Sequence, residues 1–145
     1  MILYLDTSAL VKRYFQEQHS DELLLRWREA AEIVTSSVAY AETLASVYRK
    51  KRETNLKAGS IHKVLEVFRQ DWKSFLRVEV TDELNDTVDR LLKRHPLRGF
   101  DAIHLASAVL VQGSLPHDFL FACFDQRLAQ AAQDEGLKTF PKFQS

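Results

Sequence analysis

The stretch Ile2-Leu3-Tyr4-Leu5-Asp6-Thr7-Ser8 (residues 2–8) decides the fold class. Its first four residues are all apolar, as expected of a strand that is buried on both faces of a sheet. Asp6, Thr7 and Ser8 are residue types that cap the amino end of a helix, and we expect that helix to reach about Phe15. A buried strand that leads directly into a helix is typical of a parallel α/β sheet.

The same alternation of short apolar runs and longer segments of helical period continues along the chain. Further strands are expected at 33–35, 77–80, 119–124 and 138–140, and helices at 21–31, 36–53, 56–75, 82–95, 100–112 and 125–135. The helix at 100–112 is apolar almost all round and should be central. The pattern predicts an α/β fold with about five strands between helices. Because 145 residues without a linker or repeat fit one domain, residues 1–145 are expected to form a single domain.

The composition indicates a compact, helix-rich protein. Hydrophobic residues make up 46% of the chain, which has only 4 Gly and 3 Pro, and this argues against disorder. The single Cys123 cannot form an intrachain disulfide. It lies in an apolar run, so we expect a small buried side chain rather than a reactive thiol.

The charge balance and the apolar runs limit the partners. The chain has 20 basic and 20 acidic residues, so any affinity for nucleic acid must come from local patches rather than from a global positive field. No apolar run approaches the roughly 20 residues that span a bilayer. The apolar stretch at the amino terminus lacks a basic lead and is too short for a signal peptide. We therefore expect a cytoplasmic protein without a membrane partner.

Four acidic residues are placed where they could share one pocket. Asp6 and Asp125 each follow an apolar strand, so both should lie at the carboxyl edge of the sheet, where ligands bind in open α/β folds. Asp101 lies in the first turn of the central helix, and Glu42 borders the packed face of its own helix. Taken singly, each has an ordinary explanation as a helix cap, a solvated side chain or a partner of Arg98. These explanations do not account for the grouping.

Clustered carboxylates raise one another's pKa and destabilise a fold unless cations neutralise them. Mg²⁺ or Mn²⁺, which prefer oxygen ligands, fit that need, and no His or Cys cluster with zinc spacing competes. Such a site suits phosphodiester hydrolysis, in which the metal activates a water and neutralises the leaving oxygen. His104, three residues after Asp101, could be a general base, but its apolar helix favours a hydrogen-bonded core histidine.

Four motifs resemble those of the PIN-domain nucleases, particularly the toxin component of VapBC-type toxin–antitoxin pairs. They are LDTSALVK (5–12), SSVAYAE (36–42), RGFDAIHLA (98–106) and FDQRLA (124–129). Each motif is weak alone, but four in this order across nearly the whole chain are fairly specific.

The resemblance implies a three-layer fold with strand order 3-2-1-4-5, which places Asp6 beside Asp125. It also implies a metal-dependent endoribonuclease in which Asp6, Glu42, Asp101 and Asp125 hold Mg²⁺ or Mn²⁺. Related toxins cut structured RNAs such as tRNA or rRNA, are silenced by a small antitoxin protein, and often form homodimers. The family often has Thr or Ser two residues before its last acid. This chain has Cys123 there, a departure that concerns the fourth acidic position.

Other polar residues are candidates for supporting roles. Thr7 and Ser8 could supply hydroxyl groups near the site, although both are equally explained as caps. Two groups of basic residues could bind RNA phosphates, or could simply be solvated and complement a helix dipole. These groups are Lys12 with Arg13, and the run Arg49, Lys50, Lys51 and Arg52.

Two other functions stay open, namely a catalytically silent PIN-like scaffold that binds RNA or protein, and a housekeeping RNA-processing nuclease. The presence of all four acids favours an enzyme over a scaffold. An aspartate-nucleophile phosphatase is disfavoured, because Ser8 stands where that chemistry usually has a second Asp. The chain also lacks a glycine-rich phosphate loop.

Overall fold

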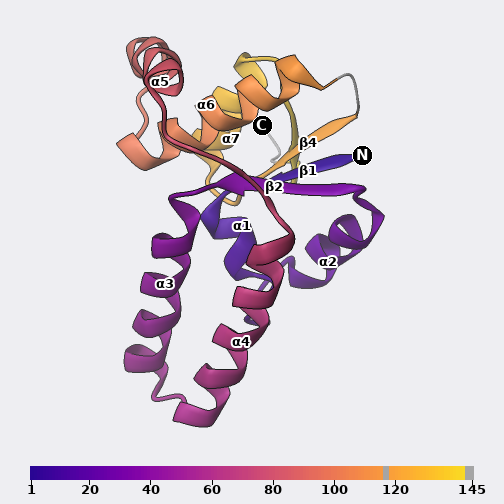
Figure 1. Ribbon diagram of the computed structural model, residues 1–145, viewed down its shortest axis with the longest axis vertical. Helices are drawn as coiled ribbons and strands as arrows, with labels where there is room; N and C mark the ends of the chain where they lie inside the picture. Colours follow the sequence, from indigo (N-terminus) through magenta and orange to yellow (C-terminus); the bar gives the residue numbers. More distant parts are fainter. Residues whose placement is uncertain (116–117, 143–145) are drawn as a thin grey trace.

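A sheet of five strands lies between two layers of helices in the computed structural model, which describes residues 1–115 and 118–142 (Figure 1). All strand pairs are parallel and the order is β3-β2-β1-β4-β5, so the predicted α/β class and the order 3-2-1-4-5 are confirmed. The strands are β1 (Ile2–Leu5), β2 (Glu32–Ser36), β3 (Leu76–Val78), β4 (Phe119–Ala122) and β5 (Lys138–Phe140).

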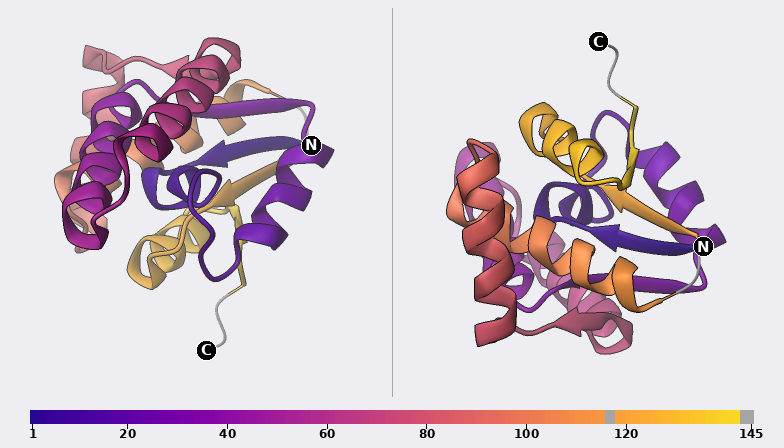
Figure 2. Two further views of the ribbon diagram at one scale, coloured as in Figure 1. Left: turned by 90° about the horizontal axis from the view of Figure 1, so that it is seen from below. Right: turned by 90° about the horizontal axis from the view of Figure 1, so that it is seen from above.

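The helices divide between the two faces of this sheet. One face is covered by α5, α6 and α7, and the other by α1, α2 and the α3–α4 pair (Figure 2). None of the helices within the described ranges is long and apolar enough to cross a membrane. The bounds are α1 (Thr7–Val11), α2 (Ser20–Glu29), α3 (Ala39–Thr54), α4 (Ala58–Ser74), α5 (Asp82–Arg94), α6 (Gly99–Ser114) and α7 (Gln126–Asp134).

Two predicted ends near the sheet edge were wrong. Helix α1 ends at Val11 rather than near Phe15, because the amides of the next three residues bond to carbonyls three positions back and the chain tightens into turns. Strand β4 ends at Ala122 rather than Phe124. The amide of Phe124 donates to the Ser8 hydroxyl at 3.0 Å instead of to a neighbouring strand.

Strand β1 separates two apolar cores. Its side chains alternate between the faces of the sheet. Ile2 and Tyr4 pack among residues of α5, α6 and α7, while Leu3 and Leu5 pack among residues of α1 to α4. Helix α6 is central, as predicted, since four of its apolar residues are fully buried: Ala102, Leu105, Ala106 and Ala108. The residue that follows β1 is therefore attached to the most enclosed strand of the molecule.

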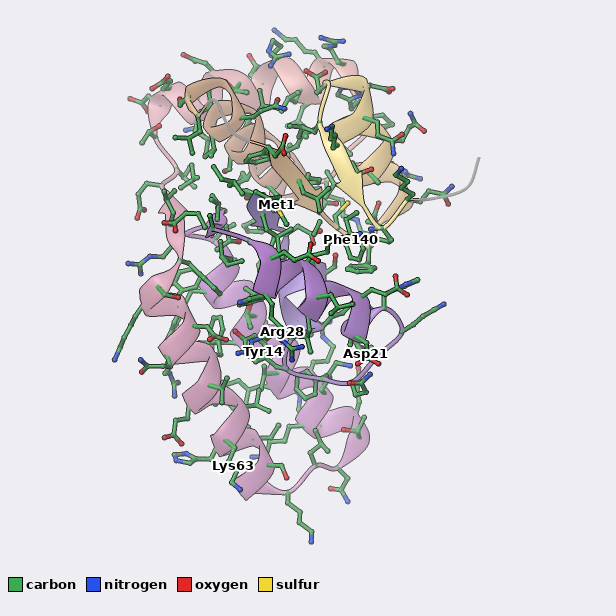
Figure 3. The ribbon with its side chains drawn as sticks, turned by 90° about the vertical axis from the view of Figure 1, so that its right-hand side faces the viewer. Met1, Tyr14, Asp21, Arg28, Lys63 and Phe140 are labelled. Carbon is green, nitrogen blue, oxygen red and sulfur yellow. The ribbon has the colours of Figure 1, made fainter. Side chains whose placement is uncertain are left out.

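Helices α3 and α4 form a hairpin that projects away from the sheet, with Lys63 toward its far end (Figures 1 and 3). A small separate cluster, built around buried Val47, Ile61 and Leu65, holds the two helices together along this projection. Glu42 lies in the first turn of α3, where the hairpin joins the rest of the molecule. The hairpin therefore delivers Glu42 to the sheet edge and extends one wall of the site outward.

Candidate active site at the carboxyl ends of the strands

Asp6 is the first residue after β1 and also caps α1. Its amide donates to the Ala122 carbonyl at 3.1 Å, and its Oδ1 accepts hydrogen bonds from the Ala9 amide (2.9 Å) and the Ser8 hydroxyl (2.7 Å). The side chain is buried, and burial raises its pKa from 3.8 to about 6. His104, Ser8 and Ala9 oppose this shift, whereas the charge of Asp101 adds to it. Asp6 therefore both caps α1 and lies at the candidate site.

Glu42 is held by two donors from other elements. Its Oε1 accepts from the Thr7 hydroxyl at 2.7 Å and lies 2.9 Å from Nε2 of His104. Burial raises the pKa of Glu42, but the hydrogen bonds from His104 and Thr7 and the nearby imidazole outweigh it, so the net pKa is lowered. Thr7, predicted as a supporting hydroxyl, thus contacts an acidic residue of the site directly.

Asp101 and Asp125 are less constrained. Asp101, in the first turn of α6, is half-buried. Its burial and the charge of Asp125 raise its pKa. It forms no ion pair with Arg98 within 4.0 Å in the described part of the chain. Asp125 is exposed and caps α7, accepting from the Leu128 amide at 2.9 Å.

All four acids line one cavity of about 540 Å³, together with Thr7, Ser8 and His104. One face of α3 continues this lining outward through Glu42, Ser46, Arg49, Lys50 and Glu53, which spans roughly 16 Å along the helix axis. A larger cavity of about 680 Å³ meets it at Arg98, Asp101 and Asp125. Because only the smaller cavity contains all four acids, it is the candidate active site, and the larger one extends it toward α7.

The predicted basic residues do not all reach this cavity. Lys12 and Lys50 line it, but both pair with Glu17, at 3.7 and 2.7 Å. Arg49 also lines it, whereas Lys51 and Arg52 do not. Arg13 lies outside the cavity and pairs with Asp71 at 3.2 Å.

Arg98 is a cationic residue of the site that the sequence motifs did not single out. It lines both cavities and is exposed. The sequence carried a signal for it, since Arg98 stands three residues before Asp101, at the cap position of the same helix.

Cys123 is buried, as expected, and its burial raises the pKa of the thiol. Its Sγ donates to the Asp125 carbonyl at 3.7 Å. The thiol therefore contacts the backbone of the fourth acid rather than the interior of the cavity.

The donors fit a hard divalent cation in kind, since carboxylate and hydroxyl oxygens dominate the cavity and burial and mutual repulsion raise the pKa values of Asp6 and Asp101. They do not form a finished cage. Across residues 1–115 and 118–142, no three His, Cys, Asp or Glu side chains are spaced as a complete metal site. Binding would have to draw the carboxylates together around the ion.

Comparisons with known proteins agree with the fold and the motifs. The family model "PIN domain" matches residues 3–134. Ribonuclease VapC45 of Mycobacterium tuberculosis (strain CDC 1551 / Oshkosh) is 29% identical over 140 residues, which covers 97% of this chain and 95% of that protein.

Solved structures that share the fold include two from bacteria. VapBC2 from Rickettsia felis, bound to a DNA fragment from its promoter, aligns with a TM-score of 0.66 and 14% identity over 96% of this chain and 97% of that chain. FitAcB from Neisseria gonorrhoeae aligns with a TM-score of 0.65 and 16% identity over 97% of this chain and 96% of that chain. With a family model that spans residues 3–134 and a sheet in the expected order, the chain belongs to the PIN domain family.

Proposed function

We propose that the protein is a Mg²⁺- or Mn²⁺-dependent endoribonuclease and the toxin of a toxin–antitoxin pair. The observation that carries this proposal is the convergence of four carboxylates, from four separate elements, on one cavity in a PIN domain. A relative that is 29% identical over 140 residues is named a ribonuclease, which supports the same chemistry. A silent scaffold would have no need for four acids in one cavity.

Each side chain has a part in this reaction. Asp6, Glu42, Asp101 and Asp125 would hold the metal, which when bound activates a water and neutralises the leaving oxygen. Ser8 and Thr7 orient Asp6 and Glu42 through the hydrogen bonds described above. Cationic side chains on the walls would bind the phosphates on either side of the scissile bond: Lys12, Arg49, Lys50 and Arg98.

The partners belong to the same proposal. The substrate is a structured RNA such as tRNA or rRNA, a small antitoxin protein blocks the site, and the protein forms a homodimer. The similarity in fold to a toxin–antitoxin complex from Klebsiella pneumoniae favours the antitoxin. A housekeeping nuclease would instead have no small neighbouring gene whose product binds the protein and stops Mn²⁺-dependent cleavage. Co-expression with the product of the adjacent gene separates the two.

The first test needs no knowledge of the RNA. Wild type and Asp101→Asn are melted with and without Mn²⁺. Mn²⁺ should stabilise the wild type, by about 2.7 kcal/mol at a hundredfold excess over Kd, because it binds only the native state. Asp101→Asn should be at least as stable as wild type without metal, because one repelling charge is gone, and should respond less to Mn²⁺.

Asp89→Asn is the matched control, since Asp89 is exposed and, among the described residues, forms an ion pair only with Lys93 on its own helix. It should respond to Mn²⁺ as the wild type does. If Mn²⁺ leaves the wild type unchanged and Asp101→Asn is simply less stable, the acids are structural and the scaffold function replaces the nuclease. A positive result justifies an assay of cleavage on total RNA with Mn²⁺ and with EDTA.

A further inference from the structure

His104 links the centre of the sheet to the acidic cavity. It lies one turn after Asp101 on α6, and only 1% of it is exposed. Its Nε2 lies 2.9 Å from Oε1 of Glu42, and its Nδ1 lies 2.9 Å from the hydroxyl of Tyr4. Both ring nitrogens therefore have partners, one on α3 and one on β1.

The direction of each hydrogen bond follows from the chemistry of the partners. Oε1 of Glu42 is a carboxylate oxygen that can only accept, and it lies 2.9 Å from Nε2, so the imidazole proton lies on Nε2. Nδ1 then accepts from the Tyr4 hydroxyl, which lies 2.9 Å away. The Thr7 hydroxyl donates to the same Oε1 at 2.7 Å and lies 3.3 Å from Nε2. With these donors and acceptors, the hydrogen bonds among Tyr4, His104, Thr7 and Glu42 are mutually consistent.

This arrangement constrains one oxygen of Glu42 and leaves the other available. Oε1 accepts from His104 and Thr7, while Oε2 accepts no hydrogen bond from any residue that the structure describes. The imidazole is itself held in place, because the Tyr4 ring meets it edge-on at 5.9 Å and stacks on Phe121 at 5.4 Å. The orientation of Glu42 is thus set from the buried core.

We propose that His104 is a positioning residue for Glu42, in which the Tyr4 hydroxyl fixes the proton on Nε2 and this N–H, with Thr7, holds Oε1 so that Oε2 remains free for a divalent cation or its water. The part that concerns the cation rests on the proposed function. His104 itself donates no group to the ion, because its two nitrogens are already engaged. Residues that orient metal ligands in this way typically change metal affinity by about 10- to 100-fold when they are lost.

Two pairs of variants in the full chain separate positioning from packing. His104→Gln keeps an N–H donor near the position of Nε2, whereas His104→Leu has similar bulk and no donor. Tyr4→Phe removes the hydroxyl that fixes the tautomer. Its matched control is Tyr14→Phe (Tyr14 is labelled in Figure 3), which also removes a phenol hydroxyl bonded at 2.7 Å, but to Asp71 and outside the cavity.

The first readout is Mn²⁺ affinity, measured by the electron paramagnetic resonance signal of free Mn²⁺. We expect His104→Leu to raise the Kd about 10-fold or more, His104→Gln to stay within about 3-fold of wild type, and Tyr4→Phe to fall between them. Tyr14→Phe should match the wild type. A folded His104→Leu variant that binds Mn²⁺ as tightly as wild type overturns the proposal, as does a His104→Gln variant that is no better than Leu.

The second readout is the tautomer of His104, read from ¹⁵N chemical shifts of the imidazole without metal. The proposal requires the proton on Nε2, with shifts that change in Glu42→Gln. A proton on Nδ1, or shifts that ignore Glu42→Gln, overturns it. This measurement also decides the matter if His104→Leu does not fold. If the wild type binds no Mn²⁺, the proposed metal-dependent function fails, while the tautomer still shows whether His104 orients Glu42.

Discussion

Asp6 and Glu42, on the α1–α3 side of the cavity, each accept two hydrogen bonds on one carboxylate oxygen. Asp101 and Asp125, on the α6–α7 side, are held far less. Among the described residues, the Asp101 carboxylate accepts no hydrogen bond, and the Asp125 carboxylate accepts only the one from the Leu128 amide that caps its own helix. Donors from several elements therefore fix the carboxylates of the first side, whereas fewer hydrogen bonds hold those of the second side.

This difference suggests how a site of like charges is tolerated. The carboxylates that are fixed have donors that offset part of their repulsion, and those without donors lie nearer to solvent, where repulsion is screened. A cation would then meet one rigid side and one adaptable side. Three experiments test this contrast.

The largest effect should come from removing an acid of the rigid side. Asp6→Asn should reduce the rate of RNA cleavage by on the order of 1,000-fold, because the buried carboxylate has no substitute. Asp125→Asn should cost only about 10- to 100-fold, since a water can take the place of an exposed ligand. The measurement is the initial rate on total RNA with saturating Mn²⁺, with Asp89→Asn as control. Equal losses at both positions would mean that the two sides contribute alike.

The pH dependence of stability should distinguish the two acids of the rigid side. In EDTA, the folded-state pKa of Asp6 is about 6, above its ordinary 3.8, so the native state binds more protons than the unfolded state between these values. Asp6 should therefore lower the free energy of unfolding by about 3 kcal/mol as the pH rises from about 4 to about 6. The pKa of Glu42 is lowered from 4.5, so its contribution is present above that value and is lost as the pH falls through its folded-state pKa.

Urea unfolding between pH 3 and 8 checks these signs. In wild type, the free energy of unfolding should fall between about pH 4 and pH 6 because of Asp6, and Asp6→Asn should abolish this fall. It should also rise with pH below 4.5 because of Glu42, and Glu42→Gln should abolish this rise. If both variants change the profile in the same direction, burial dominates at Glu42 as well, and the hydrogen bonds from Thr7 and His104 do not control its charge.

The smallest effect should come from the cationic walls. Arg98 forms no ion pair with a described residue, whereas Lys50 is already paired with Glu17. In an Asp6→Asn background, which allows binding without cleavage, Arg98→Ala should weaken RNA binding several-fold and reduce the slope of log K against log salt by about 1. Lys50→Ala should change both less. A larger effect at Lys50 would show that RNA displaces the Glu17 pair.

The fold was largely predictable because its signals are local. The apolar runs at the start of the chain and before Asp125 identified buried parallel strands, and the helical period identified the layers. The strand order came from the resemblance of motifs and not from periodicity. The end of α1 was misplaced because helix propensity continues past Val11, while the chain there closes into turns.

The site was predictable in its members and not in its contacts. Asp6 and Asp125 could be placed because parallel strands end at one edge, and all four acids do line one cavity. Their catalytic role stays a prediction. No local pattern could reveal that His104 bonds to Tyr4, 100 residues away, and to Glu42, 62 residues away. The ion pairs of Lys12 and Lys50 with Glu17 likewise form only in the folded chain and have no local sequence signal.

The pairing of β1 with β4 determines when the site is assembled during synthesis of the chain. It joins Ile2 to Phe119, and the amide of Asp6 finds its acceptor only on Ala122. Synthesis proceeds from the amino terminus, so a growing chain carries Asp6, Glu42 and Asp101 before the strand that brings Asp125 beside them. A chain that is still being translated therefore lacks the assembled cavity, and the four acids line one cavity only after β4, the second-to-last strand, has paired with β1.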